Sequence, residues 1–242
     1  MAATMFLAAK RLARRLPFYR NALVVWDLLR GGEAAQSRRL LLAQPDGLFQ
    51  PFGTTGPDRY PALFGLIRMM IDDSPDRSLL SFGCSTGEEV ASLRRLFTQA
   101  QITGIDISAD RIALCRRRLL PALGGGTRFE IAPSTTSQAP ASHDAVFAMA
   151  VFRHGGLSNG PASATPLLRF DRFAAEVAHI AACLKPGGYL IIRHANFRVE
   201  DTAAAAEFDA VHHLPRSSPV YDRDNHLVVD DHHEGVIFRK RP

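Results

Sequence analysis

Cysteine is scarce in this sequence: Cys84, Cys115 and Cys183 are the three in 242 residues. An odd number without paired spacing argues against a disulfide framework and a zinc site, and it favours reduced thiols in the cytosol. No apolar run approaches the length of a membrane span, and the short apolar stretch of residues 1–9 precedes its basic residues instead of following them. We therefore expect a cytoplasmic protein without a signal peptide.

Acidic residues are also scarce near the N-terminus. Residues 1–40 contain eight Lys and Arg against two Asp and Glu, which gives them a charge of +6. The remaining residues carry −1, so the net charge of the chain is +5. Two interpretations are open: a solvated face of an ordinary helix, or a basic amphipathic helix that makes weak contact with an acidic membrane surface. No aromatic and basic platform accompanies these charges, so we expect no nucleic-acid partner.

A strand, a turn of small residues and a helix follow one another in residues 79–97. The apolar run 79–82 leads into a turn that contains Gly83 and Gly87, and apolar residues then recur at helical spacing. Backbone N–H groups meet at such a turn, where a polar ligand can approach without obstruction from side chains. A tight turn without any ligand is the alternative if nothing downstream agrees.

Two later segments agree with a ligand site. Residues 101–107 form a second short apolar strand, and Asp106 follows Gly83 by twenty-three residues. This is about the separation at which an acid at the end of a second parallel strand binds the two hydroxyls of a ribose. Residues 184–192, LKPGGYLII, then turn through Pro-Gly-Gly into a buried strand.

Together the three segments resemble the class I S-adenosylmethionine-dependent methyltransferases, in which a glycine-rich loop, a ribose-binding acid and an LKPGG turn occur in this order. The resemblance covers roughly residues 79–239. The loop Gly-Cys-Ser-Thr-Gly-Glu-Glu is most similar to that of the chemotaxis receptor glutamate methyltransferases, which also have a serine where most relatives have an acid, here Ser81.

The resemblance implies an α/β fold: a Rossmann-like, seven-stranded, mostly parallel sheet with helices on both faces and an N-terminal helical cap. The length and the 46% hydrophobic content suit one such core with an additional lobe. We expect residues 1–75 to form the helical cap and a segment that covers the cofactor, and residues 76–242 to form the methyltransferase domain.

The hydrophobic spacing predicts individual elements of this fold. Predicted helices cover residues 5–15, 22–30, 33–43, 61 to about 72, 109–120, 166–184 (with Thr165 as its cap) and 201–210. Further predicted strands cover residues 127–131 and 144–152, and residues 227–230 with 235–240 are expected to form the closing antiparallel hairpin.

The implied cofactor is S-adenosyl-L-methionine. By the resemblance, Glu88 holds its ammonium group and Asp106 binds its ribose. Many relatives bind the adenine amino group through an acid after the third strand, but this chain has Ala132-Pro133-Ser134-Thr135 there, so Ser134 or backbone groups would substitute. The other residues predicted to shape or contact the cofactor site are Gly83, Cys84, Ser85, Gly87, Ile107 and Ala148.

The aromatic stretch of residues 48–61 contributes further candidates. Methyltransferases of this class often lay such a segment over the cofactor, so Tyr60 is a candidate to close the pocket and Arg59 to pair with the cofactor carboxylate. The alternative is a connecting loop that is plugged into the core.

The acceptor is expected at the carboxyl ends of the fourth and fifth strands, because ligands of open parallel sheets bind there. Arg153, His154 and His194 follow these strands, and the two histidines are our candidates for a catalytic base or a group that orients the acceptor. Methyl transfer from a sulfonium requires a base only when the acceptor must lose a proton. The loop of residues 155–165 is a candidate substrate loop.

Residues 230–234, Asp-Asp-His-His-Glu, suggest a metal cluster at first sight. Adjacent ligands on a strand point to opposite faces, and no second set of ligands is spaced to complete the coordination. We interpret this stretch as a polar hairpin tip and predict no metal.

The sequence therefore predicts an S-adenosylmethionine-dependent methyltransferase whose acceptor, a small molecule, lipid or glycan rather than a protein, it does not identify. Receptor glutamate methylation is not transferred, because the characteristic Cys-Arg-Asn run of the chemotaxis enzymes is absent. A non-catalytic binding or assembly module is the alternative. A nicotinamide-dependent oxidoreductase is less favoured, because Gly83 to Gly87 does not fit its G-x-G-x-x-G pattern. The sequence leaves the oligomeric state open.

Overall fold

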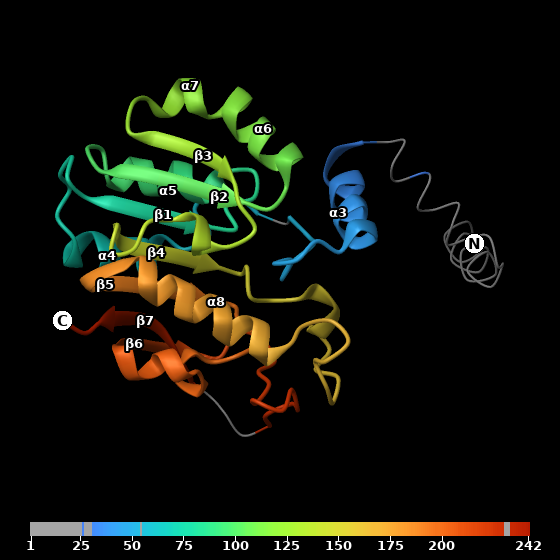
Figure 1. Ribbon diagram of the computed structural model, residues 1–242. Coiled ribbons are helices and arrows are strands. Elements are labelled where there is room, and N and C mark those ends of the chain that lie inside the picture. The colour runs from blue at the N-terminus through green and yellow to red at the C-terminus, as the bar shows by residue number, and fades with distance from the viewer. Residues whose placement is uncertain (1–25, 27–30, 54, 230–232) are drawn as a thin grey trace, which may run out of the picture. The chain divides into compact units, whose positions relative to one another are not determined.

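The computed structural model describes residues 26, 31–53, 55–229 and 233–242 (Figure 1). The chain divides into two compact units, Met1–Pro45 and Asp46–Pro242. In the first unit, helix α3 (Gly32–Ala43) agrees with the predicted helix over residues 33–43, and Gln44 ends it in a left-handed conformation with φ 40°. The helices predicted for residues 5–15 and 22–30, with most of the basic segment, lie outside the described residues, Trp26 excepted.

The second unit contains one seven-stranded sheet with the strand order β3-β2-β1-β4-β5-β7-β6. The pairings from β3 through β5 are parallel, whereas β7 pairs antiparallel with both β5 and β6. This confirms the predicted α/β class with a mostly parallel, Rossmann-like sheet. The strands are β1 (Ser78–Phe82), β2 (Gln101–Asp106), β3 (Thr127–Ile131), β4 (His143–Met149), β5 (Leu184–Arg193), β6 (Phe208–Pro215) and β7 (His233–Lys240).

Alternate residues of the central strands pack into two hydrophobic cores, one on each face of the sheet. Leu80 of β1 and Val146 of β4 pack in the core that contains α8 (Phe170–Cys183). Their neighbours Leu79 and Phe147 belong to the opposite core, because successive side chains of a strand point to opposite faces. That core contains the apolar faces of α4 (Pro61–Met70), α5 (Glu88–Leu96) and α6 (Ala109–Arg118). Figure 1 shows helices on both faces.

Helix α6 ends two residues earlier than the predicted helix over residues 109–120, and a separate short helix, α7 (Leu120–Leu123), follows it. Pro121 explains the break, because it has no N–H to donate to the carbonyl of Arg117. At the other end, the Ser108 hydroxyl accepts a hydrogen bond from the amide of Arg111 and caps α6.

The helix predicted for residues 166–184 begins later, at Phe170. The amides of Leu167 and Leu168 both donate to the carbonyl of Ala164, which makes this stretch a turn. The first helical amide, that of Phe170, donates to Oδ1 of Asn225 at 2.8 Å. A residue far along the chain therefore fixes the start of α8, which local periodicity cannot reveal.

The C-terminal predictions were wrong in two places. The helix expected over residues 201–210 is two 3-10 turns, η3 (Val199–Asp201) and η4 (Ala203–Glu207), followed by β6. The antiparallel partners of β7 are β5 and β6, and the described residues 227–229 do not pair with it. The described part of that segment is held elsewhere, because Leu227 donates its amide to the carbonyl of Ala162 and Val228 donates to Val220.

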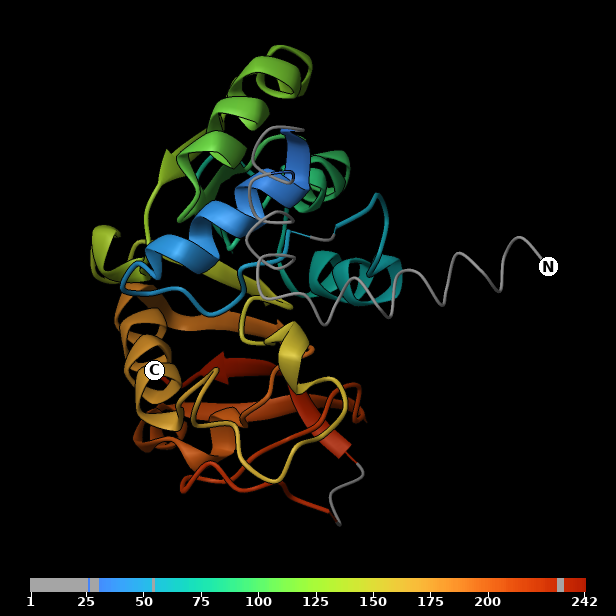
Figure 2. The same cartoon turned by 90° about the vertical axis from the view of Figure 1, so that its right-hand side faces the viewer.

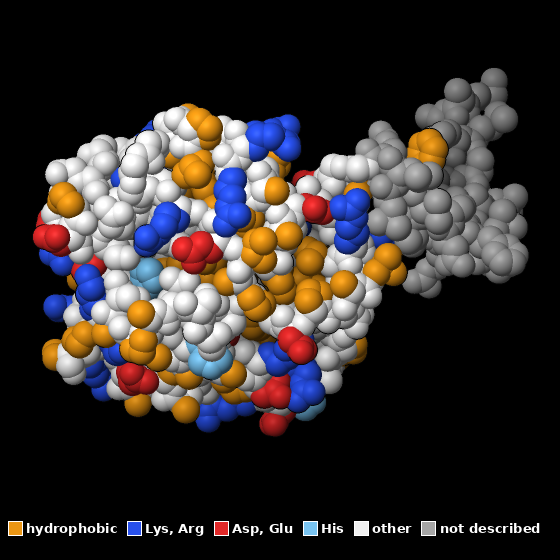
Figure 3. Space-filling view, turned by 45° about the horizontal axis from the view of Figure 1, so that its top comes forward, with side chains coloured by type: hydrophobic (Ala, Val, Ile, Leu, Met, Phe, Trp, Pro, Cys, Tyr) orange, Lys and Arg blue, Asp and Glu red, His pale blue; other side chains and the backbone are white. Residues whose placement is uncertain are grey.

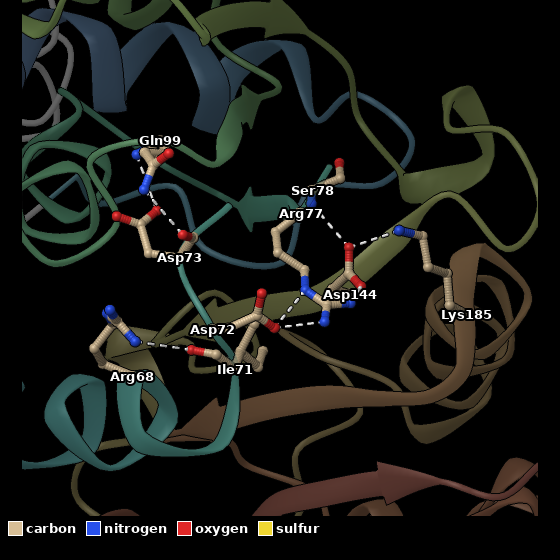
Figure 4. A network of polar contacts seen from close by, with 9 residues as sticks. All are labelled: Arg68, Ile71, Asp72, Asp73, Arg77, Ser78, Gln99, Asp144 and Lys185. Atoms are coloured by element: carbon tan, nitrogen blue, oxygen red, sulfur yellow. Dashed lines mark hydrogen bonds and ion pairs between the residues drawn. The ribbon is translucent and has the colours of Figure 1, made fainter. Parts of the chain in front are cut away.

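The amino ends of the strands are joined by a network of polar contacts (Figure 4). Asp144, at the start of β4, accepts hydrogen bonds from the Ser78 amide at 2.9 Å, from Arg77 at 3.0 Å and from Lys185 at 2.7 Å. Lys185 is the lysine of the LKPGG segment, so this part of the motif joins β5 to β4 at the edge of the sheet away from the loops that follow the strands. The neighbouring Asp73 accepts from three successive amides, those of residues 98–100.

Candidate active site

A cavity of about 370 Å³ lies at the carboxyl ends of β1, β2 and β4. Figure 2 views the sheet from the side of these strand ends. Its volume falls within the range of about 300–1,000 Å³ that is typical of small-molecule sites. The lining residues come from five segments of the second unit, within residues 47–64, 82–92, 106–111, 132–133 and 149–155.

Three non-glycine residues with positive φ follow three neighbouring strands at this edge. Ser85 after β1 has φ 51°, Ala150 after β4 has φ 61°, and His194 after β5 has φ 54°. Such conformations cost of the order of 1–3 kcal/mol each and persist only where the surroundings enforce them. Here the amide of Ser85 is held by Asp106 and the amide of Ala150 by the carbonyl of Arg193. The strained turns bring the chain segments after three strands to one place.

Asp106 is the buried acid at the end of β2, and its side chain organises the loop beside it. Its Oδ2 accepts from the Ser85 amide at 2.9 Å, and its Oδ1 accepts from the Ser108 amide at 2.8 Å. Burial raises the pKa of this carboxyl, while Arg111 and the two amides act to lower it. A carboxylate has about four acceptor sites, so two remain for hydroxyl donors in the cavity.

The turn between β1 and α5 is built from glycines that a side chain would disrupt. Gly83 has φ 73° and Gly87 has φ 92°, and a Cβ on Gly87 would lie 2.6 Å from Leu119 and 3.1 Å from the sulfur of Cys115. The amides of Gly83 and Cys84 both donate to the carbonyl of Ile105, which joins the turn to β2. Gly87 lies outside the cavity lining, and its position lets α5 begin close to the sheet.

The two acids at the start of α5 have different surroundings. Glu88 accepts a hydrogen bond from the Thr86 hydroxyl and does not line the cavity. Glu89 does line it, and its Oε1 accepts from the Ser81 hydroxyl at 2.7 Å. Burial raises the pKa of Glu89 to about 8, and the Ser81 hydrogen bond and the charge of Arg59 oppose that rise. The structure therefore places Glu89 at the cavity wall where the sequence favoured Glu88.

The segment of residues 47–60 both fills the core and borders the cavity. Phe49 is buried and packs edge-on against Phe152, with ring centroids 4.9 Å apart. Further along, the carbonyl of Gly53 accepts from the Ser85 hydroxyl at 3.1 Å, which fixes the segment to the glycine turn. Arg59 and Tyr60 line the cavity. Phe49 thus fits the interpretation of a loop that is plugged into the core, whereas Arg59 and Tyr60 are placed where a segment bordering the cofactor pocket would be.

Tyr60 and His194 form a pair of rings near one end of the cavity, with centroids 5.7 Å apart. The Tyr60 hydroxyl and Nδ1 of His194 are buried and have no hydrogen-bond partner among the described residues. Burial raises the pKa of Tyr60. Burial, followed by the charges of Arg193, Arg153 and Arg59, lowers the pKa of His194 to about 4. Both side chains are therefore neutral near pH 7.

The remaining predicted site residues fall into two groups. Residues 83–85, 106 and 107 line the cavity with Arg59 and Tyr60, whereas Glu88, Ser134, Ala148 and the two histidines do not. Ser134 donates its hydroxyl to Glu176 at 2.7 Å. Ala148 is buried in the core. Their roles as site residues stay predictions.

The backbone and ring of His154 make contacts that hold the loop after β4. Its Nδ1 accepts from the Gly156 amide at 3.1 Å, at the start of the 3-10 turn η2 (Gly155–Leu157), and its own amide donates to Oδ1 of Asn196 at 2.8 Å. Burial lowers the pKa of its imidazole. The ring also contacts Phe52 edge-on, with centroids 6.1 Å apart. These contacts shape the loop after β4.

The described ranges (26, 31–53, 55–229, 233–242) contain neither a metal-binding cluster nor a membrane-spanning helix. No group of three or more His, Cys, Asp or Glu in them could hold a metal ion. None of their helices has the length and apolar character needed to cross a membrane. Residues 230–232 of the polar stretch near β7 lie outside these ranges.

Part of the chain is similar to known methyltransferases. Residues 80–190 match the family model described as "Methyltransferase domain". The chain is 36% identical over 93 residues to trans-aconitate 2-methyltransferase of Rhodopseudomonas palustris, a match that covers 38% of this chain and 34% of that protein. It is 28% identical over 149 residues to the enzyme of the same name from Deinococcus radiodurans, covering 59% and 49%. The matches thus span only a third to a half of the length of these curated relatives.

Similar solved structures include one titled "Conversion of a Disulfide Bond into a Thioacetal Group during Echinomycin Biosynthesis", with 18% identity, a TM-score of 0.46 and coverage of 74% of this chain and 82% of that one. Another is phosphoethanolamine N-methyltransferase 2 of Haemonchus contortus in complex with S-adenosyl-L-methionine, with 17% identity, a TM-score of 0.42 and coverage of 58% and 29%. Residues 80–190 therefore correspond to an enzyme domain of the methyltransferase type.

Proposed function

We propose that this protein transfers the methyl group of S-adenosyl-L-methionine to a small-molecule, lipid or glycan acceptor rather than to a protein. The observation that carries the proposal is the cavity that the glycine turn, Asp106, Glu89 and Arg59 line together. When bound, the cofactor supplies an activated methyl group, and the protein supplies alignment and exclusion of water.

Three charged residues of the cavity have a place in this proposal. The free acceptor sites of Asp106 receive the ribose hydroxyls. Glu89, in place of Glu88, holds the cofactor ammonium, and Arg59 pairs with the cofactor carboxylate. Ile107, Ala132 and Pro133 line the adenine side of the cavity, where apolar surface and backbone groups replace the missing acid.

The serine of β1 gives the likeness to the chemotaxis receptor methyltransferases a physical interpretation. Ser81 stands where most relatives have an acid, and its hydroxyl donates to Glu89. The acid is thus supplied by the helix that follows the turn and is positioned by the serine. The likeness of this loop to that particular family stays a prediction.

A small organic acid is the first acceptor class to test. The two curated relatives are named for trans-aconitate, a carboxylic acid, although this chain matches only part of each. A cavity of about 370 Å³ also fits a small molecule beside the cofactor better than a folded protein surface.

Calorimetric titration with S-adenosyl-L-methionine and with S-adenosylhomocysteine tests the cofactor assignment, and NADH serves as the competing ligand. We expect both sulfur ligands to bind, and Asp106→Ala to weaken them about 10- to 100-fold through the lost ribose hydrogen bonds. Asp76→Ala is the matched control, because Asp76 is exposed just before β1, at the opposite edge of the sheet. Binding of NADH with no response to the sulfur ligands would overturn the proposal.

A further inference from the structure

Part of the cavity is not used by the proposed cofactor contacts. This part is largely apolar, and its charged residue is Arg153, which follows β4. The side chains that line it are Phe52, Phe64, Met149, Val151 and Arg153.

The positive charge of Arg153 differs from the others nearby in its partners. Arg111 lies 3.9 Å from Asp106, and Arg193 pairs with Glu234. The Arg153 guanidinium donates to the neutral hydroxyl of Ser158 at 3.3 Å, and no carboxylate of the described residues forms an ion pair with it. With Arg59 assigned to the cofactor, Arg153 supplies a positive charge that remains for an acceptor.

The Tyr60 hydroxyl adds a hydrogen-bond donor to the same cavity. Tyr60 and Arg153 both line it, and the positive charge of Arg153 acts to lower the pKa of Tyr60. The Tyr60 hydroxyl has no partner among the described residues, and buried polar groups of this kind are normally hydrogen-bonded. His194 is neutral and contributes no competing charge.

We propose that Arg153 and the Tyr60 hydroxyl bind the carboxylate of the acceptor, and that the acceptor is a monocarboxylic acid with an apolar body. One guanidinium offsets one negative charge, whereas a tricarboxylate would leave two charges against Phe52, Phe64, Met149 and Val151. Transferring unpaired charge into apolar surroundings is unfavourable. The inference rests on the proposed methyl-transfer function and departs from the acceptor for which the curated relatives are named.

Binding to protein saturated with S-adenosylhomocysteine tests the inference, with calorimetry as the readout. The probes are trans-cinnamate and octanoate, each compared with its neutral primary amide, and trans-aconitate. We expect each monocarboxylate to bind about 10- to 100-fold more tightly than its amide, as a charge-assisted hydrogen bond provides, and more tightly than trans-aconitate.

Variants then assign the preference to the guanidinium. Arg153→Gln should reduce the preference for acid over amide to less than about threefold, and Arg153→Lys should retain part of it, because the charge stays but the planar fork is lost. Arg118→Gln is the matched control, since Arg118 is exposed on α6 and does not line the cavity. Binding of S-adenosylhomocysteine should change less than about twofold in all three variants, a difference too small to represent a lost charged hydrogen bond.

Three results would overturn the inference: amides that bind as tightly as acids, tighter binding of trans-aconitate, or no binding of either monocarboxylate to the loaded protein. An unchanged acid preference in Arg153→Gln would also overturn it. Failure of the proposed function is recognised separately, because S-adenosylhomocysteine itself would then not bind to the wild-type protein.

Discussion

At the scale of single residues, the charge of Glu89 is decided by its enclosure. Its carboxyl is buried beside the Ser81 hydroxyl, and burial raises its pKa to about 8. Unliganded protein at neutral pH therefore holds this group mainly in the protonated form. In its proposed role Glu89 binds the cofactor ammonium as a carboxylate, so we expect cofactor binding to be coupled to loss of this proton.

This coupling predicts that the affinity for S-adenosylhomocysteine rises between pH 6 and pH 8 by up to about tenfold per pH unit. Glu89→Gln should bind more weakly at pH 8 and lose most of the dependence, because its amide does not titrate. Calorimetry at several pH values, in two buffers of different ionisation enthalpy, measures both the affinity and the protons released. An equally steep profile in Glu89→Gln would contradict the assignment.

The same group should affect the stability of the unliganded protein in the opposite sense. The pKa of Glu89 is raised from 4.5 to about 8 on folding, so the native state holds a proton that the unfolded state loses within this window. Its stabilising contribution is present in full below pH 4.5 and is lost as the pH rises through 8. Thermal unfolding should therefore show wild type losing stability relative to Glu89→Gln between these values.

The choice between Glu88 and Glu89 shows what the sequence could not determine about the site. Both acids follow Gly87, and the pattern predicts a helix beginning there. Adjacent helical residues point about 100° apart, and the phase of α5 depends on how Val90 and Leu93 pack against the sheet. The sequence predicted the glycine turn and the acid that follows β2. It could not predict which of Glu88 and Glu89 points toward the cavity, because that depends on how α5 packs.

At the scale of elements, the contact between α5 and the sheet depends on Gly104 in β2. A Cβ at this position would lie 2.9 Å from Val90, 3.0 Å from Phe129 and 3.1 Å from the sulfur of Cys84. These neighbours come from the helix, from β3 and from the glycine turn, so a methyl group would push against three elements at once.

Gly104→Ala is therefore expected to destabilise the protein by about 1–3 kcal/mol, as overpacked cores do. Gly125→Ala is the matched control, because Gly125 has no atom within 4 Å of its Cβ position; we expect a change within about 0.5 kcal/mol. Urea unfolding followed by circular dichroism measures both. A Gly104→Ala protein as stable as the control would show that α5 and β3 can move apart without cost.

The elements that the sequence predicted well are those whose signals are local. Strand β4 is an example, because its apolar run is buried along its whole length. The elements that it missed depend on distant partners. The start of α8 is set by Asn225, and β6 exposes most of its residues, so its pattern contains little hydrophobic signal.

At the scale of the whole molecule, the carboxyl ends and the amino ends of the strands have different functions. The carboxyl edge carries the strained turns and the cavity, and the amino edge carries the polar network around Asp144 (Figure 4). Elsewhere, charges of both signs are interspersed on the face shown in Figure 3, without one large basic patch. The strained turns at the carboxyl ends are tolerated because the polar network fixes the same strands at their amino ends.

The polar network predicts how the protein responds to acid. Burial alone would raise the pKa of Asp144, but hydrogen bonds from Lys185, the Ser78 amide and Arg77 outweigh it, and the pKa lies below its usual value of 3.8. A carboxyl with a depressed pKa stabilises the fold above its unfolded value, and this stabilisation is lost as the pH falls through the folded value.

Asp144→Asn should therefore lower the free energy of unfolding by about 1–3 kcal/mol at pH 7, because it leaves charged donors without their carboxylate. The difference from wild type should shrink as the pH falls below 3.8, where the wild-type carboxyl itself becomes protonated. Asp72→Asn is the matched control: Asp72 also pairs with Arg77, but its side chain is 62% exposed, and exposed ion pairs contribute less than about 1 kcal/mol. Urea unfolding at a series of pH values measures all three proteins. Parallel profiles for wild type and Asp144→Asn down to pH 3 would mean that the three strands are held at this edge by packing alone, and that the charge of Asp144 adds nothing.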